Sequence, residues 1–361
     1  MLKYLDEYRD AGLVGEISSR IKGLSSKQLN IMEVCGGHTM SIRKHGIHEL
    51  VGDNINLISG PGCPVCVTSI SDMDRAIALS ECGNTVLCTF GDMFSVPGSR
   101  SSLEKARAGG ADVRTVYSVH DALSFAAEEK DKDFIFLSIG FETTAPTAAA
   151  AVLQAKKENI DNFFVLSLNK TMPAALKAVL SGEDSRIDAL ICPGHVSTIT
   201  GTGIYRPIVN DLGVSCCVSG FEPADVLSAI YFLVESHEEG RPRLVNAYRR
   251  AVREEGNRKA CAIIDRVFEP CDAEWRGLGM IPDSGLKLRK EYSGLDAGVR
   301  FKVDVPPSAE FPGCICGDIL RGAKDPSDCP LFGKACIPEG PKGACMVSSE
   351  GACAAWYKYG N

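Results

Sequence analysis

Residues 31–39 read IMEVCGGHT, an apolar run that ends in glycines and polar residues, and residues 134–146 (FIFLSIGFETTAP) repeat that pattern. Short apolar runs bounded by glycine or proline are typical of strands buried on both faces. Eight such runs, each followed by a turn and a helical pattern, lie at residues 31–34, 55–59, 85–90, 113–117, 134–139, 163–168, 187–192 and 214–218. Strands that alternate with helices predict parallel α/β sheets.

The second four runs resemble the first four in the same order. Besides the pair above, the matching segments are residues 56–66 with 164–174, 86–99 with 189–201, and 116–126 with 217–230. This repeat predicts two similar domains, each with a Rossmann-like parallel sheet. We place the first α/β domain at residues 1–130, the second at residues 131–235, and a cysteine-rich domain at residues 236–361. In the last domain, residues 241–260 have a charged helical pattern and residues 261–270 the pattern of a further strand.

Composition and charge narrow the classes of protein that fit. The 361 residues carry a net charge of −7 without a basic stripe, which argues against binding to nucleic acid or to an anionic membrane. The N-terminus lacks the apolar core of a signal peptide, and no apolar run approaches about 20 residues, so we expect a cytoplasmic protein without a membrane span. Thiols stay reduced in that compartment, so the sixteen cysteines are expected to serve packing, metal binding or redox chemistry.

The turn after the first apolar run carries the first candidate site. Cys35 follows the run and precedes Gly36, Gly37 and His38. Parallel α/β folds bind ligands at the carboxyl ends of their strands, and glycines allow the backbone to approach a ligand closely. A cysteine and a histidine at this spacing are able to share a metal ion or a proton. The alternative is a turn that contains a buried cysteine.

The turn after the second run contains Cys63 and Cys66 in a C-x-x-C spacing. This spacing suits a reversible disulfide or two thiolate ligands of a metal ion. The next residues have a helical pattern, for which Thr68 or Ser69 is the expected N-cap. A structural zinc site would need further ligands, and the first two domains offer none at a suitable spacing.

Polar residues also follow the apolar runs of the second repeat. They are Glu142, Thr143, Thr144, Lys170, Cys192, Gly194 and His195. We expect these residues either to support the first site as its neighbours or to cap helices and hold the domain interface.

Six cysteines crowd into segments that are rich in glycine and proline and hold no histidine. They are Cys314, Cys316, Cys329, Cys336, Cys345 and Cys353. A donor set of thiols alone favours an iron–sulfur cluster, and a zinc site with four cysteine ligands is the alternative. A four-iron cluster needs four thiolates, and spacing by itself does not select four of the six.

These segments together resemble the HypD family of hydrogenase formation proteins, which are maturation factors of nickel–iron hydrogenases. The resemblance covers essentially the whole chain. It rests on the motifs EVCGGHT, SGPGCPVCVT, GFETTAPT, CPGHVSTITG, VSGFEP and SSEGACAA in this order.

The resemblance implies two related α/β domains and a third domain that carries a [4Fe-4S] cluster. The cluster spacing of the family is C-x12-C-x6-C-x16-C. The cysteines that meet it here are Cys316, Cys329, Cys336 and Cys353. Cys314 and Cys345 are then left as an accessory thiol or as packing.

The resemblance also assigns the first two turns. It implies that Cys35 binds iron with His38 beside it, and that Cys63 and Cys66 are the C-x-x-C pair of the family. We expect this pair to cycle between dithiol and disulfide or to bind iron transiently. Some members carry a second histidine two residues after the first, where this chain has Met40.

Partners follow from the same resemblance. Members of this family act with the small chaperone HypC as the scaffold on which an Fe(CN)2CO unit is assembled. The cyanides come from HypE, which is supplied by HypF, and the finished unit passes to the hydrogenase large subunit. On this reading Cys35 holds the iron jointly with a cysteine of a partner, and the cluster supplies or stores electrons.

Two other functions use parts of the same pattern. An iron–sulfur thiol–disulfide oxidoreductase acting on a protein partner would need the cluster and the C-x-x-C pair, but it would have no need for Cys35 beside His38. A zinc-stabilised binding module would need only the C-terminal cysteines.

Overall fold

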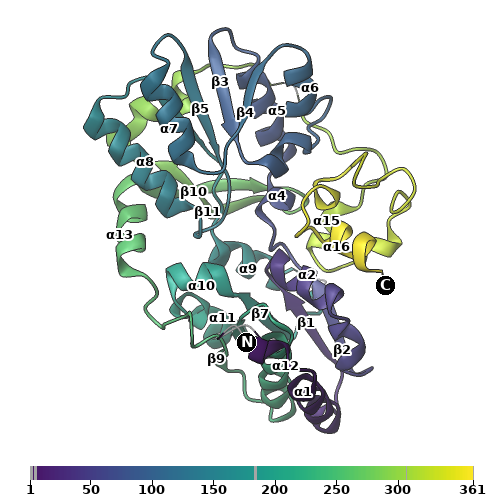
Figure 1. Ribbon diagram of the computed structural model, residues 1–361. Coiled ribbons are helices and arrows are strands. Elements are labelled where there is room, and N and C mark those ends of the chain that lie inside the picture. Colours follow the sequence, from purple (N-terminus) through teal and green to yellow (C-terminus); the bar gives the residue numbers. More distant parts are fainter. Residues whose placement is uncertain (1–2, 4–5, 183–184, 306, 361) are drawn as a thin grey trace.

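The computed structural model describes residues 3, 6–182, 185–305 and 307–360, and it contains two parallel sheets (Figure 1). The first sheet has the order β2-β1-β7-β8-β9, and the second has the order β4-β3-β5-β6. The strands are β1 (Leu29–Glu33), β2 (Ile55–Ser59), β3 (Thr85–Thr89), β4 (Asp112–Thr115), β5 (Asp133–Ser138), β6 (Phe163–Ser167), β7 (Ala189–Pro193), β8 (Ser215–Ser219) and β9 (Leu244–Asn246). Each of the eight predicted strands overlaps one of these, and the predicted α/β fold class is confirmed.

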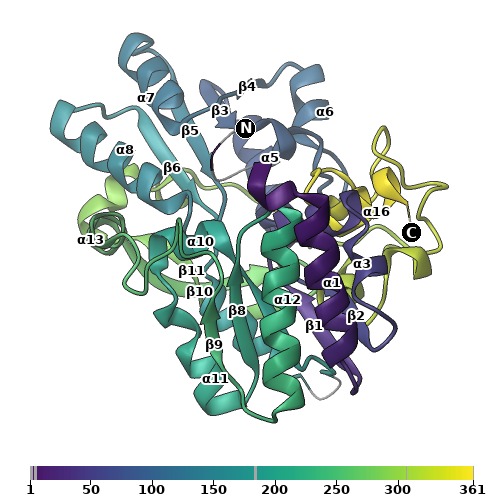
Figure 2. The ribbon, with the colours of Figure 1, turned by 60° about the horizontal axis from the view of Figure 1, so that its bottom comes forward.

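Helices cover the sheets and connect their strands. They are α1 (Ala11–Leu24), α2 (Gly36–Lys44), α3 (Ile47–Leu50), α4 (Pro64–Val67), α5 (Ile70–Ser80), α6 (Leu103–Ala108), α7 (Val119–Glu128), α8 (Ala145–Glu158), α9 (Met172–Leu180), α10 (Gly194–Thr200), α11 (Arg206–Leu212), α12 (Pro223–Glu238), α13 (Arg258–Val267), α14 (Ala297–Arg300), α15 (Cys316–Leu320) and α16 (Ala352–Tyr359). Figure 2 shows α1 and α12 side by side over the first sheet, where Ile21, Ile31 and Ile230 belong to one buried core. Burial of this apolar surface stabilises the layered arrangement.

The two sheets do not correspond to the two expected domains, which are divided between residues 130 and 131. β3, from the first repeat, pairs with β5, from the second, and β1 pairs with β7. Each sheet therefore combines two strands of each repeat, and replacing every strand by its repeat counterpart converts the order β2-β1-β7-β8 into β6-β5-β3-β4. Within the first repeat, β1 pairs only with β2 and β3 pairs only with β4, so β1 and β3 each keep one edge without hydrogen-bond partners. A strand of the second repeat pairs with each of these edges.

The expected start of the third domain at residue 236 also needs correction. β9 adds to the edge of the first sheet, so residues 244–246 belong to that sheet and not to a charged helix over 241–260. Residues 261–267 of the expected strand belong instead to α13, because the side chain of Asn257 caps this helix by accepting a hydrogen bond from the backbone N–H of Ala260. Residues 268–270 are in a strand, as expected.

A two-stranded antiparallel ribbon lies between the two sheets in Figure 1. It consists of β10 (Phe268–Trp275) and β11 (Gly279–Leu288). The backbone N–H of Leu286 donates to Asn169 beside β6, and that of Arg276 donates to Val67 of α4. The ribbon thereby joins loops that lie at the carboxyl ends of β2 and β6.

The cysteine-rich region at the C-terminus packs against the first sheet. Its last helix, α16, lies on α2, and the guanidinium carbon of Arg43 is 3.5 Å from the centre of the Trp356 ring. The short 3-10 helix Ala344–Met346 lies on α4. These contacts bring the C-terminal cysteines beside the turns that carry the predicted Cys35 and Cys63 sites.

Candidate thiol and imidazole site

The strand order of the first sheet defines where a ligand is expected. β1 and β7 are neighbours, and the chain continues from β1 to β2 on one side and from β7 to β8 on the other. Such a switch point leaves a crevice at the carboxyl ends of the two central strands. Cys35 begins α2 after β1, and Gly194 and His195 begin α10 after β7, so the structure brings these predicted residues to one crevice.

Cys35 is the N-cap residue of α2 and is 9% exposed. The turns around it are tightly packed, because a Cβ on Gly62 would lie 2.1 Å from the backbone nitrogen of Cys35. Burial and the nearby carboxylate of Glu350 raise the pKa of Cys35 to about 12, although the backbone amides of Gly37 and His38 stabilise its thiolate. The group is a protonated thiol at neutral pH, and a bound metal ion would replace that proton.

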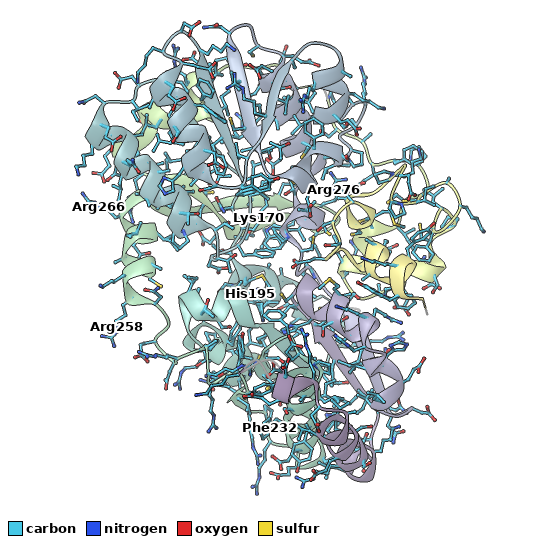
Figure 3. The ribbon with its side chains drawn as sticks, viewed as in Figure 1. Lys170, His195, Phe232, Arg258, Arg266 and Arg276 are labelled. Atoms are coloured by element: carbon cyan, nitrogen blue, oxygen red, sulfur yellow. The ribbon has the colours of Figure 1, made fainter. Side chains whose placement is uncertain are left out.

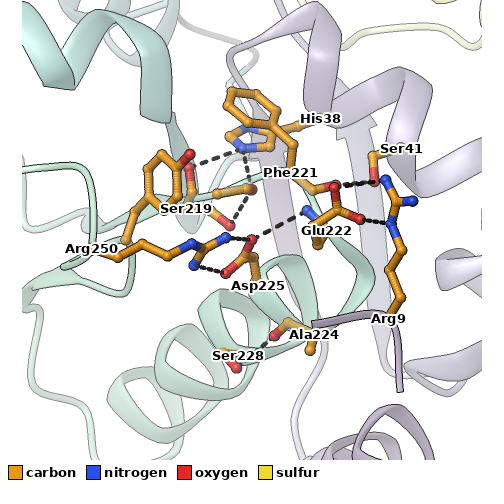
Figure 4. Close-up of polar contacts among 12 residues, drawn as sticks. Arg9, His38, Ser41, Ser219, Phe221, Glu222, Ala224, Asp225, Ser228 and Arg250 are labelled. Carbon is orange, nitrogen blue, oxygen red and sulfur yellow. Dashed lines mark hydrogen bonds and ion pairs between the residues drawn. The ribbon is translucent and has the colours of Figure 1, made fainter. Parts of the chain in front are cut away.

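His38 is completely buried beside the β8 carbonyl groups. Its Nε2 lies 3.0 Å from the carbonyl oxygen of Gly220 and 3.3 Å from that of Ser219 (Figure 4). Because a carbonyl only accepts hydrogen bonds, Nε2 carries the proton and Nδ1 carries the lone pair. Nδ1 is buried and has no hydrogen-bond partner among the described residues. Burial lowers the pKa of His38 to about 4, so the ring is neutral and suited to bind a metal ion.

The loop after β8, which holds these carbonyl groups, is fastened on several sides. The Ser41 hydroxyl donates to the carbonyl oxygen of Phe221 at 2.6 Å. The backbone N–H of Glu222 donates to Asp225, whose carboxylate also accepts two hydrogen bonds from Arg250 (Figure 4). Because its acceptors are held in place in this way, His38 keeps one tautomer and one orientation.

The ring of Phe221 connects two imidazoles. His38 stacks on it with a centroid distance of 4.7 Å, and His195 stacks on it with a centroid distance of 4.2 Å. The His195 side chain reaches solvent, whereas His38 does not. Because neighbouring residues cover part of the His195 ring, its pKa is lowered. The sequence pattern suggested no role for Phe221, because its partners come from strands far away in the chain.

Cys63 and Cys66 lie directly against the Cys35 turn. The backbone N–H of Gly36 donates to the carbonyl oxygen of Gly62 at 3.1 Å. Cys63 is the N-cap of α4, and its sulfur accepts a hydrogen bond from the backbone N–H of Cys66 at 3.3 Å. The expected helix after this pair is α5, and Ser69, one of the two expected residues, caps it.

The six C-terminal cysteines line a single pocket, whose walls are otherwise mostly apolar. Its lining residues are Cys314, Cys316, Ile319, Cys329, Leu331, Phe332, Cys336, Gly343, Cys345, Met346 and Cys353. The Cys316 and Cys345 sulfurs are 2.6 Å apart. Burial raises the pKa of Cys353, and so do the thiols of three neighbours, Cys336, Cys314 and Cys329.

Cys345 links this pocket to the C-x-x-C pair, a connection that the sequence pattern did not reveal. Burial raises the pKa of Cys66, while a hydrogen bond with the Cys345 thiol lowers it. Cys66, Cys345 and Cys316 thus form a continuous row of thiols. Within the ranges that the structure describes, no three His, Cys, Asp or Glu side chains are arranged to bind one metal ion by themselves. Cys35, Cys63 and Cys66 are therefore neighbours but not a preformed three-ligand site.

The polar residues of the second sheet form a separate cluster. Glu142 accepts a hydrogen bond from the backbone N–H of Met172 at 3.0 Å, and burial raises its pKa to about 7. The Lys170 amine donates to the carbonyl oxygen of Glu274 at 2.7 Å and lies 3.3 Å from the Asp72 carboxylate. These residues do not join the Cys35 crevice.

The remaining predicted residues have structural surroundings. The Thr144 hydroxyl donates to the carbonyl oxygen of Ile139 at 2.9 Å, and Thr143 is half-buried. Cys192 is buried within β7, next to the thiol of Cys216. A Cβ on Gly194 would lie 2.4 Å from the carbonyl oxygen of Ser219, so only glycine allows the loops after β7 and β8 to approach so closely.

Fold and site define a doubly wound α/β protein in which the thiols of Cys35, Cys63 and Cys66 and the imidazoles of His38 and His195 lie at the carboxyl end of one sheet. A family model described as HypD, hydrogenase formation hypA family, matches residues 12–360. The chain belongs to this family of hydrogenase maturation factors.

Curated relatives align with the chain over nearly its full length. The chain is 45% identical to the hydrogenase maturation factor HypD of Azotobacter vinelandii, over 99% of this chain and 97% of the relative. It is 45% identical to HypD of Rhizobium leguminosarum bv. viciae, over 99% and 96%, and 42% identical to HypD of Rhodobacter capsulatus, over 99% and 98%. In the described part of the chain, no helix has both the length and the apolar character needed to cross a membrane.

Proposed function

We propose that this hydrogenase maturation factor is the scaffold on which an Fe(CN)2CO unit is assembled, together with the small chaperone HypC. The observation that carries the proposal is the pairing of Cys35 with His38 at the switch point. One residue offers a buried thiol, and the other offers a neutral imidazole whose Nδ1 has no hydrogen-bond partner among the described residues. These are soft and intermediate donors, which suit low-spin ferrous iron.

The iron is the cargo of this site, and Cys35 is its anchoring residue. The thiol gives up its proton when iron binds, and the amides of Gly37 and His38 help to hold the resulting thiolate. In this proposal a cysteine of the chaperone serves as a further ligand of the iron. Cys63 and Cys66 lie close enough to the Cys35 turn to bind the iron transiently.

The C-terminal pocket suits a [4Fe-4S] cluster, because six thiols converge between apolar walls without a histidine. When bound, such a cluster supplies electrons one at a time. Cys329, Cys336 and Cys353 are three of its proposed ligands. The family spacing makes Cys316 the fourth, and the thiols of Cys345 and Cys353 raise the pKa of Cys316, so this residue also lies beside Cys353.

Cys63 and Cys66 are the proposed redox pair. Their oxidation to a disulfide releases two electrons and two protons, and reduction takes up the same number. The row from Cys66 through Cys345 to Cys316 places this pair beside the cysteine pocket. In this proposal HypE, supplied by HypF, brings the cyanides in the cytoplasm, and the hydrogenase large subunit receives the finished unit.

Infrared spectroscopy of the complex purified with HypC tests the proposal. We expect cyanide and carbon monoxide stretching bands in the wild type and their complete loss in Cys35→Ser. Cys82→Ser is the matched control, because Cys82 is half-buried after the C-terminal end of α5, where its thiol donates to the carbonyl oxygen of Ala78, and the bands of this variant should equal those of the wild type. Bands retained in Cys35→Ser would refute the assignment of the iron ligand.

A thiol–disulfide oxidoreductase is the second candidate, and the contact between Cys66 and Cys345 favours it. It predicts a reducible Cys63–Cys66 disulfide and a brown chromophore in a protein that never shows the infrared bands. Metal analysis that finds zinc without iron or acid-labile sulfide would exclude both functions and support a zinc-stabilised binding module.

A further inference from the structure

We propose that His195 binds the iron unit from the β7 side of the crevice, by donating a hydrogen bond from its imidazole N–H to an iron-bound cyanide. The inference rests on the proposed function and adds a residue to the same site. In this proposal His195 recognises a linear, anionic ligand of the iron, and Cys35 binds the iron.

The position of His195 follows from the topology of the first sheet. Cys35 follows β1 and His195 follows β7, so the two residues lie after the two strands that flank the switch point. Figure 3 shows His195 on the side of the first sheet that faces the second sheet. A group bound in this crevice meets residues from both loops.

The ring of Phe221 shows how close the two loops are. A Cβ on Gly37 would lie 3.0 Å from Cε1 of this ring and 3.7 Å from the Cys35 sulfur, so the thiol and the ring border the same point. A Cβ on Gly194 would lie 3.2 Å from Cε2 of the same ring. Phe221 therefore spans the distance from the Cys35 turn to the His195 turn.

His195 has the hydrogen-bonding capacity that this role needs. No hydrogen bond or ion pair involves its ring nitrogens among the residues that the structure describes, and its side chain is exposed. His38, in contrast, uses its N–H on the carbonyl oxygens of Ser219 and Gly220. A neutral imidazole always carries one N–H, so His195 retains a donor for a ligand in the crevice.

The surroundings distinguish cyanide from carbon monoxide. An iron-bound cyanide presents a nitrogen lone pair that accepts a hydrogen bond, whereas bound carbon monoxide accepts one far more weakly. His195 offers the donor, and the Phe221 ring offers an apolar wall next to it. The two diatomic ligands are thereby directed to different parts of the crevice.

Two substitutions separate hydrogen bonding from stacking. His195→Phe keeps an aromatic ring on Phe221 but has no donor, while His195→Gln keeps a donor but has no ring. In the complex purified with HypC, we expect His195→Phe to retain the iron content of the wild type and to show cyanide bands at lower wavenumber, because a hydrogen bond to the nitrogen raises the frequency of this stretch. His195→Gln should stay close to the wild type. The control is His120→Phe, an exposed histidine after β4 of the second sheet, which should leave the bands unchanged.

Three results would overturn the inference. Cyanide bands of His195→Phe that equal those of the wild type would show that no hydrogen bond is lost. Shifted bands in His195→Gln but not in His195→Phe would show that only stacking matters. Loss of iron in His195→Phe, as in Cys35→Ser, would make His195 an iron ligand. Failure of the proposed function is a separate outcome, because the wild type itself would then lack the bands.

Discussion

The loops after β1 and β5 occupy equivalent places in the two sheets, but they carry different kinds of chemistry. After β1, Cys35 and His38 are buried, and Nδ1 of His38 has no hydrogen-bond partner among the described residues. After β5, the Ser138 hydroxyl donates to Asn169 at 2.6 Å, and Glu142 accepts from the backbone N–H of Met172 while its Oε2 is buried without a partner in the described part of the chain. The repeat therefore supplies two similar frameworks, and the side chains place a thiol and an imidazole in one and a buried carboxyl group in the other.

The loops after β2 and β6 differ in a similar way, because the first carries thiols and the second carries a buried lysine. Cys63 and Cys66 follow β2 and meet the C-terminal cysteine pocket through Cys345. Lys170 follows β6 and is held by the β10–β11 ribbon through the carbonyl oxygen of Glu274. The loop of the first sheet thus lies beside a row of thiols, and the loop of the second sheet is hydrogen-bonded to the β10–β11 ribbon.

The largest expected effect concerns the thiols on the side of the first sheet. We expect Cys336→Ser to lose the brown chromophore and the cluster iron completely, because Cys336 is one of the proposed ligands. The family spacing predicts that Cys316→Ser shares this loss and that Cys314→Ser keeps the chromophore. Visible absorption and iron analysis measure both. The reverse result would place Cys314 in the ligand set instead of Cys316, and Cys271→Ser in the ribbon serves as the unaffected control.

On the side of the second sheet, Lys170→Met should lower the free energy of unfolding and leave the cyanide and carbon monoxide bands unchanged. Lys170 is 3% exposed, and its removal leaves the Asp72 carboxylate and the Glu274 carbonyl without their donor. We expect a loss of about 3 kcal/mol in the free energy of unfolding, measured by urea denaturation. Lys177→Met on the exposed face of α9 is the control, with a change within about 0.5 kcal/mol. If the Lys170→Met protein folds but lacks the infrared bands, Lys170 takes part in the chemistry, and the contrast between the two sheets is wrong.

A slightly smaller effect depends on pH. Burial raises the pKa of Glu142 to about 7, so the folded protein holds a proton that the unfolded chain releases near pH 4.5. The resulting stability is fully present below pH 4.5 and is lost as the pH rises through 7, by roughly 3 kcal/mol at most. Urea titrations from pH 5 to 8 should show a flatter profile for Glu142→Gln than for the wild type. Equal slopes would mean that Glu142 is already ionised in the folded protein at pH 5.

The smallest expected effect tests the attachment of the C-terminal region to the first sheet. Trp356→Leu removes the contact with Arg43 and should lower the free energy of unfolding by about 1 kcal/mol. Tyr357→Leu, on the exposed side of α16, is the comparison variant, because its ring contacts Phe332 and not Arg43. A Trp356→Leu protein as stable as the control would show that α16 is held to α2 by other contacts.

Local signals in the sequence predicted the elements and the reactive turns. Short apolar runs marked all eight strands of the repeats, and glycines marked the turn at Cys35. The helix that follows Cys66 begins at the expected cap residue Ser69. The same signals failed at residues 261–267, where the cap at Asn257 favoured the helix α13 over the strand-like pattern. These signals act over a few residues, and for that reason they are readable from the chain alone.

The sequence by itself determined the eight strands of the repeats, the repeat itself and the presence of three thiol-bearing segments. Only the tertiary structure decided that β1 pairs with β7, that Phe221 stacks on His38 and His195, and that Cys345 connects Cys66 to the C-terminal pocket. His38 and the carbonyl oxygen of Ser219 are 181 positions apart, and yet they lie 3.3 Å from each other. Such contacts depend on which open strand edges close and which helices pack together, and the spacing of residues along the chain contains no measure of that distance.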